Sequence, residues 1–163
     1  MALKLLEELY VSKAVIMIRI ILALILATIA FSIWGYVWYA TVFDDVWQSL
    51  IGRSETALIE MAEQRGGIQD VFVVLISLVQ AAGIFFALKF MRAKTFWHYM
   101  GVSVLLSTLL VLPALGNTTL FVGTPLNLLL LDYGHFLFGY AGMALVFFII
   151  DPPSKKAPEN SEA

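Results

Sequence analysis

The chain has 163 residues and a formal net charge of −2, and 61% of its residues are hydrophobic while only 13% are charged. A soluble domain carries about a quarter charged residues, so this apolar excess predicts a protein that faces lipid. The small net charge gives no bulk attraction for nucleic acid, and the lack of cysteine excludes disulfides, thiol catalysis and cysteine-held metals.

Four apolar runs are each long enough to cross a bilayer, which takes roughly 20 residues of helix. Because a helix satisfies its own backbone, and no run alternates like a barrel strand, the predicted fold class is all-α, an integral membrane four-helix bundle. The predicted spans are 14–43, 68–88, 96–115 and 126–150, within one membrane domain over 1–151. Residues 152–163 are polar and Pro-rich, which predicts a disordered cytoplasmic tail.

The basic residues divide unevenly between the two sides of such a bundle. Only Arg53 and Arg65 lie in the long loop after the first span. The positive-inside rule therefore predicts that both termini are cytoplasmic and that this loop faces out. The other eight fall on the terminal side, and they are Lys4, Lys13, Arg19, Lys89, Arg92, Lys94, Lys155 and Lys156.

The end of the first span is rich in aromatic residues. Trp and Tyr favour the headgroup region, so Trp38, Tyr39, Phe43 and Trp47 are predicted to form an interfacial aromatic belt. Tyr36 lies deeper, and we expect it to pack against a neighbouring helix. A site for a lipid or quinone headgroup is the less favoured interpretation of this stretch.

The pattern W-Y-x-x-x-F-x-x-x-W formed by those four belt residues, followed by a glycine and a short acidic helix, resembles a bacterial family of small four-helix membrane proteins. That family is known only as a domain of unknown function. The resemblance covers most of the chain, with a short basic link before the third span. It implies a protein of the bacterial inner membrane, and it implies no activity and no functional residues.

The long outer loop contains the signals of a short amphipathic helix. Ser54 can cap its first turn, and Gly66-Gly67 can end it. Leu58, Met61 and Ala62 then share one face, so the helix is predicted to lie on the outer membrane surface.

The fourth span carries ionisable residues inside an apolar run. At about 100° per residue, Asp132, His135, Gly139 and Gly142 fall on one stripe of the helix. Small residues let membrane helices approach, and polar residues hydrogen-bond across the contact, so the stripe is predicted to face another helix. By the rise of each helix, the other spans place four polar residues at a similar depth, namely Tyr36, Ser77, Gln80 and Thr108.

Several interpretations of this polar layer compete. Asp132 and His135 can form a structural clasp between helices, or a proton or small-solute site, because ionisable residues inside a membrane are rare and costly. A lipid- or quinone-binding site is the third possibility. The clasp fits best with a small chain that lacks an inverted repeat. We therefore expect a non-enzymatic structural or accessory subunit that packs with itself or with a larger membrane complex, the alternative being a small transporter or proton-coupled permease.

No cofactor or metal is expected. His98 lies near the opposite membrane surface from His135, which disfavours a bis-histidine haem within one chain. Asp132 and His135 alone supply too few ligands for a metal site. The expected partners are the lipid bilayer and a second copy or another membrane protein, with no nucleic acid.

Overall fold

The computed structural model describes the backbone of residues 2–150 and the side chains of residues 13–54 and 56–150, so the predicted tail at 152–163 lies outside the described residues. The described backbone forms helices in the following order: α1 (Ala2–Val37), the π-helical segment η1 (Trp38–Val42), α2 (Asp44–Ile51), α3 (Glu55–Arg65), α4 (Ile68–Phe90), α5 (Phe96–Leu106), the π-helical segment η2 (Ser107–Val111), α6 (Leu112–Asn117), the π-helical segment η3 (Thr118–Val122) and α7 (Leu126–Ile150).

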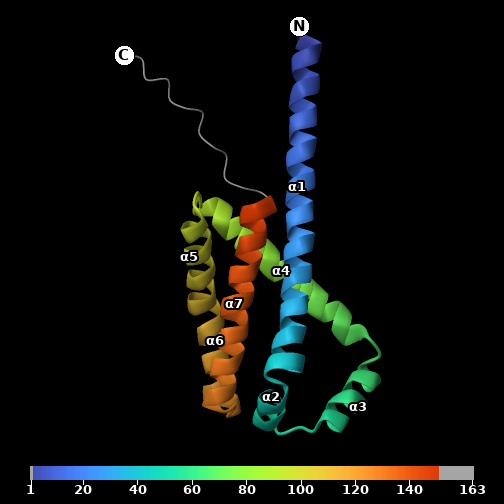
Figure 1. Cartoon of the computed structure of the whole chain (residues 1–163), viewed down its shortest axis with the longest axis vertical. Helices are drawn as coiled ribbons and strands as arrows, with labels where there is room; N and C mark the ends of the chain where they lie inside the picture. The colour runs from blue at the N-terminus through green and yellow to red at the C-terminus, as the bar shows by residue number, and fades with distance from the viewer. Residues whose placement is uncertain (1, 151–163) are drawn as a thin grey trace.

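Four helical stretches are long and apolar enough to cross a membrane, and they are Lys13–Val42, Ile68–Phe90, Phe96–Val122 and Leu126–Ile150. The chain is therefore an all-α, multi-pass membrane bundle, which confirms the predicted fold class. In Figure 1, α7 stands beside the column formed by α5 and α6, and it packs against α1 on its other side.

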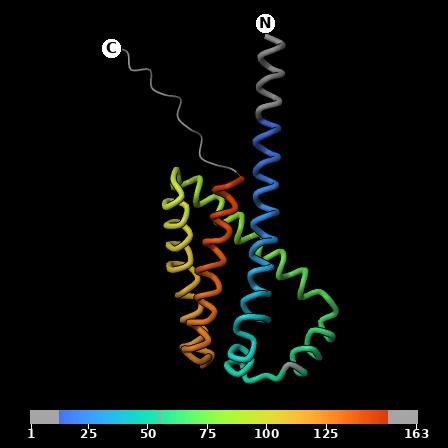
Figure 2. The backbone as a smooth tube through the Cα atoms, in the orientation of Figure 1, coloured from blue at the N-terminus to red at the C-terminus, as the bar shows by residue number. Residues whose placement is uncertain are grey.

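α4 crosses the bundle obliquely and leaves it at one end (Figures 1 and 2). Its C-terminal half is buried, with Ala81, Ile84 and Leu88 at most 2% exposed. Its N-terminal half is largely exposed, including Ile68 and every residue from 71 to 76. The helices are therefore tightly packed near the C-terminus of α4 and spread apart near its N-terminus.

The main core lies in the closely packed half of the bundle. Small residues of α1, such as Ala23 and Ala27, are fully buried there and let the helices approach. Larger side chains fill the remaining space, and among them are Phe31, Ile84, Phe85, Tyr99, Met143 and Phe147.

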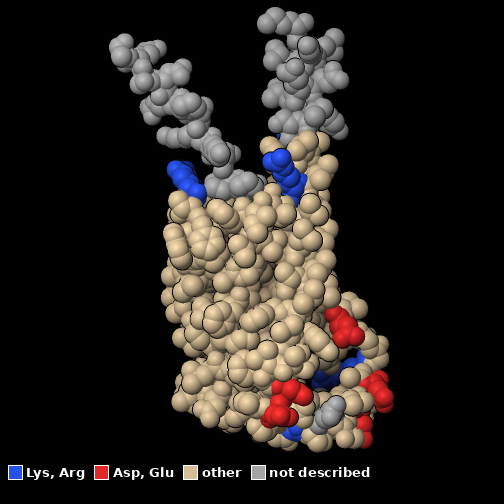
Figure 3. Space-filling model, in the orientation of Figure 1, with Lys and Arg blue, Asp and Glu red and all other residues tan. Residues whose placement is uncertain are grey.

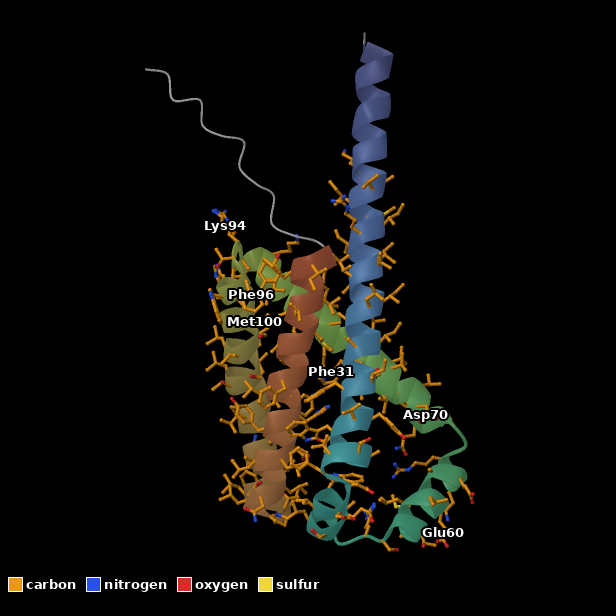
Figure 4. All side chains as sticks on the ribbon, viewed as in Figure 1. Phe31, Glu60, Asp70, Lys94, Phe96 and Met100 are labelled. Atoms are coloured by element: carbon orange, nitrogen blue, oxygen red, sulfur yellow. The ribbon has the colours of Figure 1, made fainter. Side chains whose placement is uncertain are left out.

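The two ends of the bundle differ in charge. Figure 3 shows basic side chains at one end and acidic side chains gathered around α2 and α3 at the other. Lys94 lies at the first, here called the basic end, and Glu60 and Asp70 lie at the second, the acidic end (Figure 4). This separation agrees with the division of basic residues in the sequence.

The third span is longer than the sequence suggests. The predicted span ends at residue 115, whereas the helical path continues through α6 and η3 to Val122. Pro113 lies in the first turn of α6, directly after η2. A proline clashes with the carbonyl of the preceding turn, and a wider π-helical turn next to it gives the helix a way to continue. Gly123, with φ of 79°, ends the path.

The loop between the first and second spans contains one helix more than predicted. α3 has the predicted bounds, because the Ser54 side chain accepts a hydrogen bond from the Ala57 amide and Gly66 ends the helix with φ of 56°. The additional helix, α2, carries Asp44 and Asp45 in its first turn, where negative charge favours a helix N-terminus. α2 packs against α7, so it lies over the acidic end of the bundle.

Candidate functional site: a crevice at the acidic end

Asp132 is held by a tyrosine of η1. The Tyr39 hydroxyl donates a hydrogen bond of 2.8 Å to Asp132 Oδ1, which links η1 to α7. The sequence suggested Tyr36 at this depth, but Tyr36 is 70% exposed. The face of α1 that meets α7 contains Phe31, Trp34 and Trp38 at helical spacing, and Tyr36 lies off that face.

His135 lies beside this link and is buried among aromatic rings. Its side chain is 6% exposed, and its ring centroid lies 4.9 Å from that of Tyr39 and 5.1 Å from that of Phe31. Trp34 Nε1 donates to the backbone carbonyl of His135 at 3.0 Å. This hydrogen bond and the ring contacts fix the position of the imidazole.

Neither ring nitrogen of His135 has a hydrogen-bond partner among the described residues. A β-carbon added at Gly35 would lie 3.3 Å from Nε2, so the small size of Gly35 leaves room at this nitrogen. Every imidazole has hydrogen-bonding capacity at both nitrogens, and leaving a buried donor or acceptor unpaired costs about 1–3 kcal/mol. Such a group points to a missing partner.

A cavity of about 890 Å³ adjoins His135, between α1 and the diverging half of α4, and it is here called the crevice. α2 and α3 contribute Trp47 and Leu58 to its wall. Figure 4 shows two residues that line this region, with Phe31 near the C-terminal end of α1 and Asp70 at the start of α4. The polar residues that line it are Ser32, Tyr36, Tyr39, Asp44, Gln48, Gln69, Asp70, Ser77 and His135.

The charge of the crevice is one-sided. Asp44 and Asp70 are among its lining residues, and no Lys or Arg of the described chain lines it. No group of three or more His, Asp or Glu among the described residues could hold a metal ion. The crevice can therefore attract a neutral or positively charged group more readily than an anion.

The other residues of the predicted polar layer, apart from Tyr36, lie on two sides of α7. Ser77 is buried, donates to the Val73 carbonyl of its own helix at 2.8 Å, and lines the crevice. Gln80 is half-buried, and its Oε1 has no partner among the described residues. Thr108 lies on the far side and shares a hydrogen bond of 2.8 Å with the Tyr133 hydroxyl, a partner that the sequence analysis missed.

The two glycines of the predicted stripe have different surroundings. A β-carbon on Gly139 would lie 2.6 Å from Phe31 Cδ2, so this glycine allows α1 and α7 to approach. A β-carbon on Gly142 would meet nothing within 4 Å. Both glycines line an apolar groove of about 350 Å³ together with Ala30, Trp34 and Phe138.

The aromatic residues predicted as an interfacial belt form a packed cluster. Trp38 is 8% exposed, and its ring centroid lies 4.6 Å from that of Phe43 in a tilted arrangement. The ring centroids of Tyr39 and Trp47 lie 5.4 Å apart, also tilted. A β-carbon on Gly134 would lie 3.0 Å from Trp38, so α7 also provides space for this ring. Two members of the cluster, Tyr39 and Trp47, line the crevice together with His135 of α7.

Comparisons with known proteins place this architecture in a family. The model of a family described as "Protein of unknown function (DUF1761)" matches residues 22–148. The match confirms the resemblance to a family of unknown function, whereas bacterial origin stays a prediction. No curated protein matches the chain, and no solved structure matches it.

Proposed function

The chain belongs to DUF1761, a family of unknown function, and we propose that it binds an uncharged or cationic amphipathic molecule taken from the bilayer. The observation that carries this proposal is the His135 imidazole, which is buried at the wall of the crevice with both nitrogens unpaired among the described residues. The polar head of the ligand hydrogen-bonds to this imidazole.

The size and position of the crevice support this proposal. Pockets for small molecules measure about 300–1,000 Å³, and the crevice measures about 890 Å³. It lies between α1 and the half of α4 whose apolar residues are exposed. A molecule dissolved in the hydrocarbon layer therefore enters sideways, with its apolar part against residues such as Val73 and Phe31.

The lining residues define the class of ligand. Asp44 and Asp70 disfavour an anion. The Tyr36 hydroxyl can donate to a ligand carbonyl, whereas the Ser32 hydroxyl, which donates to the Thr28 carbonyl, can accept from a ligand hydroxyl. A neutral lipid or a quinone has this combination of a polar carbonyl head and an apolar tail.

Asp132 supports a second candidate function. Its hydrogen bond with Tyr39 joins two spans, which favours the structural clasp and the accessory subunit that packs with itself or with a larger complex. A proton-coupled permease that uses Asp132 and His135 as a pair is less favoured, because the Tyr39 hydroxyl already occupies the carboxylate. The two leading functions are compatible, since the clasp also fixes the ring beside His135.

A separate proposal concerns the orientation of the protein in the membrane. We propose a bacterial inner-membrane protein with both termini in the cytoplasm, so that the crevice opens in the outer half of the bilayer. The support is the positive-inside rule applied to the basic end, which carries Lys13, Lys89 and Lys94.

Tryptophan fluorescence tests ligand binding. Ubiquinone-2 is added to the full chain in lipid nanodiscs, in a Trp97→Phe background, because Trp97 lies in a different helix, α5, while Trp34, Trp38 and Trp47 surround the site. We expect saturable quenching. His135→Gln should weaken the affinity for the quinone by about tenfold, which corresponds to the loss of one hydrogen bond of about 1.4 kcal/mol.

The chain supplies a matched control, because His98 is its only other histidine and lies exposed in α5. His98→Gln should leave quenching unchanged. Dioctanoylglycerol, a neutral lipid with ester carbonyls, should compete with the quinone. Equal quenching of both histidine variants, with unchanged thermal unfolding of His135→Gln, would contradict the proposal, as would quenching that never saturates.

A further inference from the structure

A second cavity, here called the vestibule, lies at the acidic end between α2, α3 and the turn at Gly123–Pro125. Its volume is about 660 Å³, and apolar side chains such as Leu50, Ile51 and Leu128 form much of its wall. Trp47, Leu58 and Gln69 line both the vestibule and the crevice, so they form the partition between them.

Two arginines line the vestibule, and they are the only basic residues between the first and second spans. Arg53 follows Gly52, which ends α2 with φ of 65°, and Arg65 is the last residue of α3 before Gly66. The two left-handed glycine turns therefore bring residues from different helices to one cavity. No Asp or Glu is among the described residues that line it.

Among the described residues, the hydrogen bonds of these guanidinium groups go to uncharged acceptors. Arg53 Nη1 lies 3.0 Å from the Met61 thioether sulfur, a weak acceptor, and Arg65 Nη1 donates at 3.0 Å to the neutral Gln69 amide. Neither group hydrogen-bonds to a carboxylate in the described part of the chain. This is so although acidic residues are abundant nearby in the sequence, with Asp44 and Asp45 in α2, Glu60 and Glu63 in α3 and Asp70 in α4.

We infer that the vestibule binds the anionic head of an amphipathic molecule, such as the phosphate of a lipid, with Arg53 and Arg65 on the anion. Guanidinium groups match the geometry of phosphate and carboxylate oxygens, and two of them at one cavity favour a phosphate over a neutral head. The apolar wall formed by Leu50, Ile51 and Leu128 takes the adjoining chain. The acidic crevice prefers the opposite charge, so this inference does not depend on the proposed function.

Calorimetry with short-chain lipids tests the inference. Dihexanoylphosphatidylglycerol is titrated into the full chain in neutral nanodiscs at low salt, with dihexanoylphosphatidylcholine and inorganic phosphate as separate probes. We expect saturable binding of the phosphatidylglycerol that the double variant Arg53→Gln/Arg65→Gln weakens at least about tenfold. The matched control, Lys13→Gln/Lys94→Gln, removes the same charge from the basic end and should bind as the parent does.

Two results would overturn the inference. Equal affinity of the two double variants would show that net charge, and not the vestibule, attracts the lipid. Binding of inorganic phosphate as tight as that of phosphatidylglycerol, with the same dependence on the arginines, would show that a free anion is the ligand and that the apolar wall is unused. His135→Gln should bind the anionic lipid normally, which separates this test from that of the crevice.

Discussion

A β-carbon added at Gly139 should destabilise the bundle, whereas the same change at Gly142 should not. The added carbon at Gly139 would lie 2.6 Å from Phe31 Cδ2 and 3.1 Å from Trp34 Cδ1. Both distances are shorter than van der Waals contact, so α1 and α7 must separate or the Phe31 ring must move. Overpacking of this kind costs about 1–3 kcal/mol.

Gly142→Ala is the matched control because both glycines lie in α7, one turn apart, and the space beside Gly142 is open. Replacing glycine by alanine inside a helix also stabilises it, by up to about 1 kcal/mol, and this gain is common to both variants. The difference between the two therefore reports the contact with Phe31. We expect Gly139→Ala to have a free energy of unfolding lower than that of Gly142→Ala by about 1–3 kcal/mol.

Unfolding of the two variants by SDS in mixed micelles, followed by circular dichroism, measures this difference. Equal free energies of unfolding would refute the reasoning, because they would mean that α1 and α7 do not meet at Gly139. Gly139→Ala and Gly142→Ala should also differ in their effect on the crevice. A displaced Phe31 ring would disturb His135, because the two ring centroids lie 5.1 Å apart.

Three further predictions concern the hydrogen bond between Tyr39 and Asp132, the helix α3 and the topology. Tyr39→Phe should lower the free energy of unfolding by about 1–2 kcal/mol because it leaves Asp132 without its donor, whereas the exposed Tyr36→Phe should be neutral; equal effects would contradict the clasp. Ser54→Ala should cost α3 about 1 kcal/mol and speed hydrogen exchange of its amides, and unchanged exchange would show that the cap is unimportant. In this cysteine-free chain, Glu60→Cys should react with a membrane-impermeant maleimide from outside the cell and Lys94→Cys should not; the reverse pattern would invert the topology.

Much of the fold follows from local signals in the sequence. Apolar runs predict the spans because a buried backbone must form its own hydrogen bonds. Ser54 predicts the start of α3 because its side chain accepts a hydrogen bond from a free amide of the first turn. Gly66 predicts the end of α3 because a glycine readily adopts a positive φ. The end of the third span at 115 was not predicted correctly, because the π-helical turn before Pro113 lets the helix continue and such turns have no clear sequence pattern.

The site was predictable only in part. Helical periodicity places Asp132, His135 and Gly139 on one face of α7, and the structure brings that face against α1. Depth alone could not choose between Tyr36 and Tyr39 as the partner of Asp132, because depth contains no information on rotation about the helix axis. The helix face that carries Trp34 and Trp38 could have indicated Tyr39 as the partner, because Tyr39 follows Trp38 and lies nearer to that face than Tyr36 does.

The crevice itself could not be predicted from periodicity. It exists because α4 leaves the bundle over its N-terminal half, and that half is as apolar as a tightly packed helix would be. Large apolar residues serve both lipid-facing surfaces and helix contacts, so the run of Val, Ile and Leu in this half does not say which of the two it faces. The unpaired state of His135 likewise depends on the three-dimensional position of every neighbour.

Nitrogen-15 NMR of the histidine side chains tests most directly the claim that the crevice binds a ligand through His135. The chain has two histidines, so labelling of this residue type gives one reporter in the crevice and one control, His98, in α5. On addition of ubiquinone-2 in nanodiscs, we expect a saturable shift of a His135 ring nitrogen and no shift for His98. A His135 signal that stays fixed while ligand is present at saturating concentration would contradict the account, and so would equal shifts of both histidines.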